Sequence, residues 1–340
     1  MDSKKIIPVI LDNLVWVLLV GVVILFSVLS PAYLTQANFM NILFRAAVLG
    51  LMVIAQAFVL ITGNFDLSIE STLAFCALLG AWLVVRPGPP DNGSGLELHP
   101  FIAIALLLLA GLLIGIINGN LITRMKMNNF IVTLAMLITL RGVMHLLPAG
   151  NTVYNTPPLY NIFGQARIGS IPLPVVIIII VFILAHVVLK NTPFGRNLYA
   201  IGANREAARA SGINPERRIR QVYLIAGLLA AFAGWMLSGR INSVPPNMAQ
   251  GMVFEVFAAA VIGGVSLQGG RGTMLGAFGG VLLLSAISAG LNLVDVSTFW
   301  VDTIRGLIIL FAMLIDAQKV RYRAPVVQTA MATSSPAATT

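Results

Sequence analysis

The chain has 340 residues, of which 58% are hydrophobic and only 10% are charged. A water-soluble domain needs far more polar surface to cover itself, so this composition excludes a soluble enzyme or a soluble binding module. The formal net charge of +9 would suit a nucleic-acid-binding protein, but in so apolar a chain the placement of the charges relative to a membrane decides their meaning.

Apolar runs near the length that a bilayer core requires, about 20 residues, recur along the chain. They predict an all-α polytopic membrane protein, because a membrane barrel would show alternating segments of about ten residues instead. The first run follows Lys4 and Lys5 and has no small-residue cleavage site after it, so we expect it to remain as a span. About ten transmembrane helices fit the pattern, over residues 14–33, 40–62, 68–86, 100–123, 130–147, 172–190, 221–241, 253–268, 273–293 and 299–316.

The positively charged residues predict the orientation of these spans. Most of the 21 lysines and arginines fall near the two ends of the chain and in alternate loops, which the positive-inside rule places in the cytoplasm. We therefore expect both termini to be cytoplasmic and the loops 87–99 and 148–171 to lie outside. Residues 1–13 would form a cytoplasmic N-terminus and residues 317–340 a cytoplasmic, disordered tail. Spans two to five and seven to ten then start from opposite sides, which is compatible with an inverted repeat.

The stretch YAIGANREAARASGINPERR, residues 199–218, is the least membrane-like part of the chain. Asn204 can cap a helix, the Ala-rich run after it is strongly helix-forming, and Gly212 suits the left-handed position after a helix end. A helix this short is not stable alone, so something must hold it. Two interpretations stay open: a basic loop that merely obeys the positive-inside rule, and a docking helix whose arginines seek acidic groups of a cytosolic partner.

Polar residues within or near the spans are candidates for a path across the membrane. Asp66 lies at a span junction, where a carboxylate is a functional candidate by default, although an N-cap of the third span is the favoured interpretation. Snorkelling to the interface explains the polar residues near the outer ends of spans five and ten, and contact with an external protein is the alternative. These residues are Arg141, His145, Asp302 and Arg305. The translocation-path candidates are Gln56, Asn64, Asp66, Asn118, Asn120, Glu255 and Asn292.

A group of glycines lies between the eighth and ninth spans. It is not a phosphate-binding loop, because no G-x-x-x-x-G-K-[ST] is present and the G-x-G-x-x-G spacing fails after Gly272. It predicts a tight cytoplasmic turn, with glycine supplying positive φ and close packing. The turn residues are Gly263, Gly264, Gly269, Gly270 and Gly272. No catalytic motif and no Cys/His metal cluster occur in the sequence, and the single cysteine, Cys76, is expected to be a small buried hydrophobe.

Four stretches of the sequence resemble segments of a known family of transport proteins. YAIGANREAARASGIN resembles the cytoplasmic coupling segment of bacterial ABC importer permeases of the ribose-type, monosaccharide-importing subfamily. The stretches ITGNFDLSIES (61–71), INGNLITRMKMNNFIVTLAM (117–136) and FAAAVIGGVSLQGGRGTMLGAFGG (257–280) resemble further segments of that subfamily. The resemblance covers about residues 40–316. The chain departs from the family's pattern at Glu70 and Ala135, where glycine is usual, and at Asn129, where proline is usual.

The resemblance implies the ABC importer permease fold for residues 14–316. It implies a non-enzymatic subunit that translocates a monosaccharide or a related small polar solute. The coupling segment, 199–218, would dock onto a separate ABC ATPase that uses ATP and Mg, while this chain binds no cofactor and no metal. A second permease chain, identical or related, and an extracytoplasmic sugar-binding protein would complete the system in the cytoplasmic membrane of a bacterium. The residues implied in ATPase coupling are Asn204, Arg205, Glu206, Ala207, Ala208, Arg209, Ser211 and Gly212.

Two other functions stay open on the residues alone. An ion-coupled secondary transporter of a small polar solute would need carboxylates at broken helices inside the membrane. Asp66, Glu70 and Glu255 are available for that role, but they form no evident cluster in the sequence. A membrane anchor or scaffold without a transport role is disfavoured by the Gly-rich, interrupted spans, because an anchor needs no irregular backbone at depth.

Overall fold

The computed structural model describes residues 14–297, 300, 303, 306, 307 and 310. Within these residues the chain is mostly helical, and its strands are short pairs of residues. The elements in chain order are α2 (Leu14–Leu29), α3 (Gln36–Ile61), α4 (Ile69–Val84), α5 (Pro100–Thr123), α6 (Asn129–Leu146), β1 (Val153–Tyr154), α7 (Ile162–Gln165), β2 (Arg167–Ile168), β3 (Ile171–Pro172), α8 (Leu173–Asn191), α9 (Pro193–Ala203), α10 (Arg205–Ala210), α11 (Pro215–Ile241), β4 (Ser243–Val244), α12 (Met252–Ile262) and α13 (Met274–Leu293).

Six of the described helices are long and apolar enough to cross a membrane, namely α3, α5, α6, α8, α11 and α13. Three more, α2, α4 and α12, are apolar but shorter. The prediction of an all-α polytopic membrane protein is therefore confirmed, and each of these helices coincides with one predicted span. The number of about ten full spans is not confirmed. Helix α12 has 11 residues, which at about 1.5 Å per residue is too short for a core of about 30 Å.

Some predictions concern parts of the chain that the structure does not describe. The tenth predicted span, 299–316, lies largely outside the described residues. The N-terminal segment 1–13 and the tail 317–340 lie outside them as well, together with Asp302 and Arg305.

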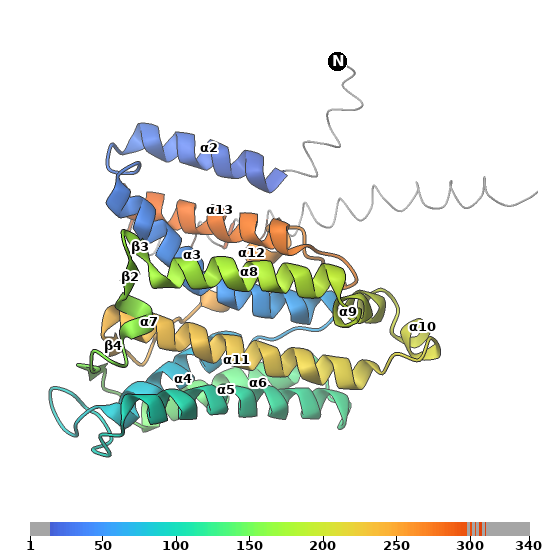
Figure 1. The fold of residues 1–340 in the computed structure, drawn as a ribbon, viewed down its shortest axis with the longest axis horizontal. Coiled ribbons are helices and arrows are strands. Elements are labelled where there is room, and N and C mark those ends of the chain that lie inside the picture. The colour runs from blue at the N-terminus through green and yellow to red at the C-terminus, as the bar shows by residue number, and fades with distance from the viewer. Residues whose placement is uncertain (1–13, 298–299, 301–302, 304–305, 308–309, 311–340) are drawn as a thin grey trace, which may run out of the picture.

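The helices lie side by side, and the connections gather at two opposite ends of the bundle (Figure 1). One end carries α9 and α10 and is called here the α10 end. The other end carries α7 and the four strands and is called the strand end. There β1 pairs with β4 antiparallel, with Val153 opposite Val244, and β2 pairs with β3. The β1–β4 pair joins the loop that follows α6 to the loop that follows α11.

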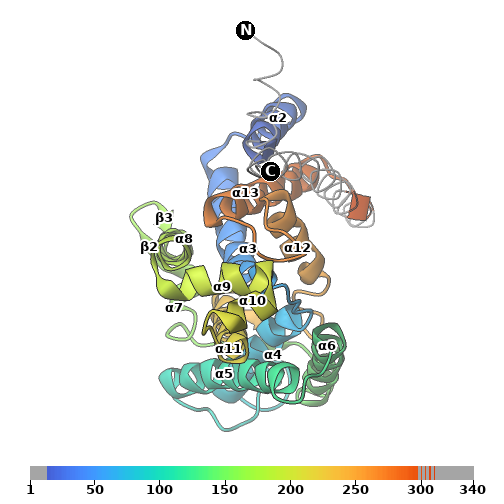
Figure 2. The same ribbon diagram turned by 90° about the vertical axis from the view of Figure 1, so that its right-hand side faces the viewer.

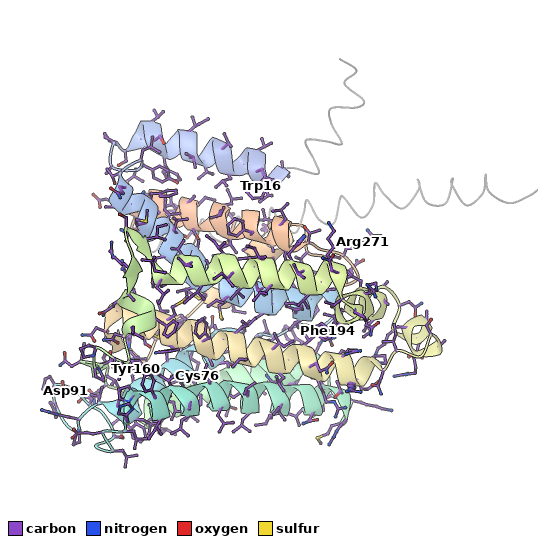
Figure 3. The ribbon with its side chains drawn as sticks, in the orientation of Figure 1. Trp16, Cys76, Asp91, Tyr160, Phe194 and Arg271 are labelled. Atoms are coloured by element: carbon purple, nitrogen blue, oxygen red, sulfur yellow. The ribbon has the colours of Figure 1, made fainter. Side chains whose placement is uncertain are left out.

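Helices α3 and α11 form the centre of the bundle. Helix α3 is buried almost without interruption from Ala46 to Ile61. Helix α11 packs against α5, α4 and α3, and it crosses α5 where both helices carry glycine. A Cβ atom on Gly227 would stand 2.1 Å from the carbonyl oxygen of Gly111, so only glycine permits this crossing. Cys76 lies inside the bundle on α4, fully buried as the sequence predicts (Figure 3).

Two groups of helices meet along the contact between α11 and α3 (Figure 2). The first, called the α11 group, consists of α4, α5, α6 and α11. The second, called the α3 group, consists of α2, α3, α12 and α13. Helix α8 packs on the α3 group, chiefly on α3 itself. Because α11 and α3 make the most extensive contact between the groups, the other links between them are few and easily identified.

Candidate functional site

The coupling segment predicted over 199–218 consists of two helices with a joint at Asn204. Asn204 is the C-cap of α9 and also the N-cap of α10. Its Oδ1 atom accepts hydrogen bonds from the backbone N–H groups of Glu206, at 3.0 Å, and Ala207, at 2.9 Å. Gly212 has a φ of +81° and follows the end of α10, where Ile213 N–H donates to the carbonyl of Ala208. The cap and the stop that the sequence predicts are both present.

Two arginines of this segment, Arg205 and Arg209, form ion pairs with acidic side chains of the same segment. Arg209 forms ion pairs with Glu206, at 3.1 Å, and with Glu216 at the start of α11. Arg205 also reaches Glu216, at 3.2 Å. In this conformation Arg205 and Arg209 have acidic partners within the chain, and their binding to acidic groups of a partner protein stays a prediction. Such exposed pairs contribute about 0–1 kcal/mol each, so they fix side-chain positions more than they stabilise the fold.

Helix α9 packs directly on the end of α3 and on the turn between α12 and α13. The hydroxyl of Tyr199 donates to the carbonyl of Gly272, at 2.7 Å, and burial raises the pKa of this hydroxyl, so it remains a donor. Gly202 touches the end of α3, where a Cβ atom would stand 1.9 Å from the carbonyl oxygen of Ile61. The same carbonyl accepts a hydrogen bond from Gly270 N–H, at 2.9 Å. Helix α9 is thereby in direct contact with the end of α3 and with the turn between α12 and α13.

The glycines predicted to form a tight turn lie between α12 and α13 at the α10 end. Four of them have positive φ: Gly264, Gly269, Gly270 and Gly272. Gly263 has an ordinary φ of −69°, and its role is close packing instead. A Cβ atom there would stand 2.4 Å from the carbonyl oxygen of Gly276 in α13. Arg271 is exposed at the same end of the molecule, near α9 (Figure 3).

Asp66 belongs to the irregular segment 62–68 between α3 and α4, and it is not the N-cap of α4. The N-cap is Ser68, whose side chain makes no capping hydrogen bond. Asp66 Oδ1 accepts from the N–H and the hydroxyl of Ser68, at 2.9 and 2.6 Å, so the carboxylate orders the turn that precedes the helix. The favoured N-cap interpretation is wrong by two residues, because the chain stays irregular until Ser68.

Two asparagines connect segment 62–68 to neighbouring helices. Asn118 of α5 donates to the hydroxyl of Ser68, at 2.9 Å, while its buried Oδ1 has no partner among the described residues. Asn129, at the start of α6, donates to Oδ1 of Asn64, at 3.1 Å. Asp66, Asn118 and parts of α4 and α11 line a crevice that is too narrow to admit a water molecule. These polar groups therefore fix a broken helix junction in this conformation and do not form a solute pocket.

The N-termini of the two short helices α4 and α12 meet inside the bundle. Helix α4 follows segment 62–68 and runs to the strand end, while α12 follows segment 245–251 and runs to the α10 end. Glu70, in the first turn of α4, accepts a hydrogen bond from Val253 N–H, at 3.0 Å. Glu70 also pairs with Arg141 of α6, at 3.0 Å, with their side chains 5% and 15% exposed. The interpretation of Arg141 as a snorkelling interfacial residue is thus wrong, because its charge is used in the interior.

Glu255 lies in the first turn of α12 and forms a second, partly exposed ion pair. Its partner is Arg45 of α3, at 3.1 Å. Arg45 is not among the residues predicted from the sequence, and neither is Met248, whose carbonyl accepts from Arg141 at 2.8 Å. A lone arginine within an apolar run was the available signal for Arg45, since a cation at that depth requires a partner. No sequence signal marked the carbonyl of Met248.

The seven path candidates do not converge on one site. Gln56 is fully buried in α3, and both atoms of its amide group lack a partner among the described residues. Asn120 is partly buried near the end of α5, and Asn292 is exposed near the end of α13. Asn64, Asp66, Asn118 and Glu255 are used in the contacts described above. In the described part of the chain, no three His, Cys, Asp or Glu side chains are close enough to hold a metal ion.

The strand end has a polar network that no sequence pattern predicted. Asn161 and Thr156 both donate to Oδ1 of Asn242, at 2.8 and 2.9 Å. Asn242 closes the C-terminus of α11 in the left-handed conformation, with φ of +57°. Asp91 and Tyr160 lie at this end as well (Figure 3). The network joins the loop after α6 to the end of α11, so it holds this loop in place at the strand end.

Comparison with known proteins gives one family for this chain. The family described as "Branched-chain amino acid transport system / permease component" matches residues 38–313. The ribose import permease protein RbsC of Bacillus subtilis (strain 168) is 38% identical over 299 residues, which are 87% of this chain and 90% of that protein. The L-arabinose ABC transporter permease protein AraH of Azospirillum brasilense is 34% identical, over 86% and 84% of the two chains. The fructose import permease protein FrcC of Rhizobium meliloti is 33% identical, over 88% and 83%. No solved structure matches.

Proposed function

The chain belongs to the family of transport-system permease components, and on that premise we propose that it carries a monosaccharide across the cytoplasmic membrane of a bacterium. It is a multi-pass transport subunit of an ABC importer and not an enzyme. The relatives named above are permeases for ribose, L-arabinose and fructose. Their names favour a sugar over a branched-chain amino acid, although the family as a whole is described by the latter.

The α10 end is the proposed docking site of a separate ATPase subunit, which would use ATP and Mg. The observation that supports this assignment is the close packing of α9 on the end of α3 and on the glycine turn. Gly202, Tyr199 and Asn204 hold the exposed α9–α10 pair against the end of α3 and the glycine turn. A partner that pushes on α10 therefore moves rigid elements of the bundle and does not merely bend a loop. The docking residues would be those of the predicted coupling set, Asn204 to Gly212.

The remaining partners and the orientation follow from the same assignment. An ATPase at the α10 end makes that end cytoplasmic, which agrees with the predicted orientation from the basic residues. The strand end then faces outward and is the surface that a sugar-binding protein would approach. A second permease chain, identical or related, would complete the membrane part, and the segment 299–316 would supply a further span. Both termini would be cytoplasmic.

Co-purification tests the proposal with a matched control. Glu206 and Arg209 pair with each other on the exposed α10, so the double variant E206A/R209A removes a surface pair. Arg86 and Glu97 form a similarly exposed pair at 3.7 Å in the loop of the strand end, and R86A/E97A is the control. We expect E206A/R209A to retain several-fold less ATPase than the wild-type chain and R86A/E97A to retain the wild-type amount.

Transport is the second readout. ATP-dependent uptake of radiolabelled D-ribose into vesicles is expected, with L-arabinose, D-fructose, D-galactose and L-leucine as competitors. If E206A/R209A keeps all of its ATPase, α10 is not the docking site. If the wild-type chain retains no ATPase and its uptake collapses with an ionophore, the chain is an ion-coupled transporter and the proposal fails. Competition by L-leucine alone would replace the sugar assignment by the amino-acid one.

A further inference from the structure

Two broken helices begin at the same interior point of this molecule. Helices α4 and α12 have 16 and 11 residues, about 24 and 16 Å at 1.5 Å per residue, so both start part-way across the bundle. They occupy corresponding places in the predicted inverted repeat, as spans three and eight, and they run in opposite directions. In transporters built from inverted repeats, such paired interruptions lie at the interface where the two repeats rock against each other. The contact between their N-termini is therefore a candidate site for control of the transport cycle.

A closed set of polar contacts joins these two N-termini. Glu70 Oε2 accepts from Val253 N–H, at 3.0 Å, and Glu70 Oε1 accepts from a guanidinium N–H of Arg141, also at 3.0 Å. Another N–H of Arg141 donates to the carbonyl of Met248, at 2.8 Å. These four residues are called here the half-helix lock. The carboxylate lies at the positive ends of two helices, and the guanidinium balances its charge, so the closed lock leaves no uncompensated charge in the interior.

The lock links two groups of helices that pack little against each other at this point. Helix α12 packs mainly on α13 and α3, whereas α4 packs mainly on α11, α5 and α6. Direct packing between α4 and α12 is slight. Figure 2 shows α12 with the α3 group and both α4 and α6 with the α11 group. The extensive contact of the groups, α11 on α3, lies elsewhere. Polar bonds therefore carry a large share of the contact between the two half-helices.

We propose that the half-helix lock is closed in one state of the transport cycle and open in the other, and that Glu70 and Arg141 are the positioning residues that set the balance. This inference rests on the proposed function, because it assigns the lock to an ATP-driven cycle. A tightly packed apolar contact would resist separation throughout the transport cycle. When Glu70 and Arg141 separate, each can instead form hydrogen bonds with water. The pair thus favours two discrete arrangements of α4 and α12 over a continuous range.

A buried hydrogen bond within the α3 group supplies a control. The hydroxyl of Tyr33, between α2 and α3, donates to the carbonyl of Ala286 in α13, at 3.1 Å. Tyr33→Phe removes this bond and leaves the contact between α4 and α12 untouched. If the lock acts by joining the groups, only the loss of Glu70 and Arg141 changes the cycle.

Cross-linking in the assembled transporter tests the proposal. The Cys76→Ala chain carries new cysteines at Phe65, just before α4, and at Phe257 in α12, two partly exposed residues whose ring centroids lie 6.1 Å apart. The complex with its ATPase is treated with a short bifunctional maleimide, first without nucleotide and then after trapping with ATP and vanadate. With the lock intact, we expect the cross-linked fraction to differ at least fivefold between the two states. This arm needs no substitution in the lock itself.

The variants make the assignment specific. In E70Q/R141Q we expect the difference between the two states to fall below twofold, and the ATP hydrolysed per D-ribose transported to rise several-fold. In Y33F we expect both quantities to stay as in the wild type. Equal cross-linking in both states of an active wild-type complex would overturn the proposal, and so would wild-type behaviour of E70Q/R141Q. Equal effects of E70Q/R141Q and Y33F would overturn it too. Failure of the proposed function shows separately, as a wild-type chain that retains no ATPase.

Discussion

Gly202 of α9 lies so close to the end of α3 that a Cβ atom on it would stand 1.9 Å from the carbonyl oxygen of Ile61 and 2.4 Å from the backbone nitrogen of Gly270. Both neighbours are backbone atoms, which no side-chain rotation can move away. The helix that carries the proposed docking surface is therefore fixed by direct backbone contact to two connections of the bundle. This relationship leads to the first prediction.

Gly202→Ala is expected to push α9 away from the end of α3 and from Gly270. Overpacking of this kind costs about 1–3 kcal/mol, and here the displaced element is the proposed ATPase contact. We expect a lower unfolding temperature in detergent and several-fold less ATPase retained on purification. Gly142→Ala is the control, because Gly142 in α6 has open space around the Cβ position. A G202A chain that matches G142A in both measurements would show that the contact yields without consequence.

Asn204→Ala is expected to loosen α10 without disturbing α9. The substitution removes the acceptor for two backbone N–H groups at the start of α10, and the loss of such a cap costs about 1 kcal/mol. A helix of six residues has little else to hold it, so we expect the amount of retained ATPase to fall. Asn204→Asp keeps an acceptor in the same place and should restore docking. If N204D binds as poorly as N204A, the amide itself contacts the partner and capping is not the cause.

Asn129 offers a prediction in which proline is tolerated better than alanine. Asn129 is the first residue of α6, its backbone N–H makes no described hydrogen bond, and Asn128 before it is extended, with φ of −64° and ψ of 126°. Proline suits such a position. N129A and N129P both lose the hydrogen bond to Asn64, which lowers the free energy of unfolding by about 1 kcal/mol. Proline offsets part of this loss because it restricts the conformations of the unfolded chain.

Thermal unfolding in detergent should therefore rank the wild type first, then N129P, then N129A. Asn128→Ala is a suitable comparison, since it removes the cap of the same helix. An N129P chain less stable than N129A would mean that the start of α6 differs from the geometry described here.

Glu70 and Arg141 should show strongly non-additive effects on stability. Removing one member of a buried ion pair leaves the other charge without compensation, which costs about 3–5 kcal/mol, whereas removing both avoids that penalty. We expect E70Q and R141M each to lower the unfolding temperature more than the double variant E70Q/R141M does. A double-mutant cycle measured by denaturation in detergent would report the coupling. Additive effects would show that the two side chains act independently.

Local features of the molecule were predictable from the sequence. The apolar runs marked the position of every helix that could span a membrane in the described residues, and Asn204 and Gly212 marked the start and end of α10. The separate helix α9 was not predicted, because the run 193–203 is only moderately apolar and begins within the expected loop. Asp66 was misplaced by two residues for a related reason: whether a chain turns helical at Asp66 or at Ser68 depends on what packs against segment 62–68, namely Asn118 and Asn129.

By itself, the sequence determined that the chain crosses a membrane several times, roughly where it does so, and which family it resembles. Hydropathy, capping and positive φ are properties of neighbouring residues, so they can be identified without a fold. Only the tertiary structure decided the partners of the interior charges. Glu70 and Arg141 are 71 residues apart, and Arg45 and Glu255 are 210 residues apart. A charge inside a bundle requires a partner, but the partner is fixed by how the helices pack, and that packing is a property of the whole chain.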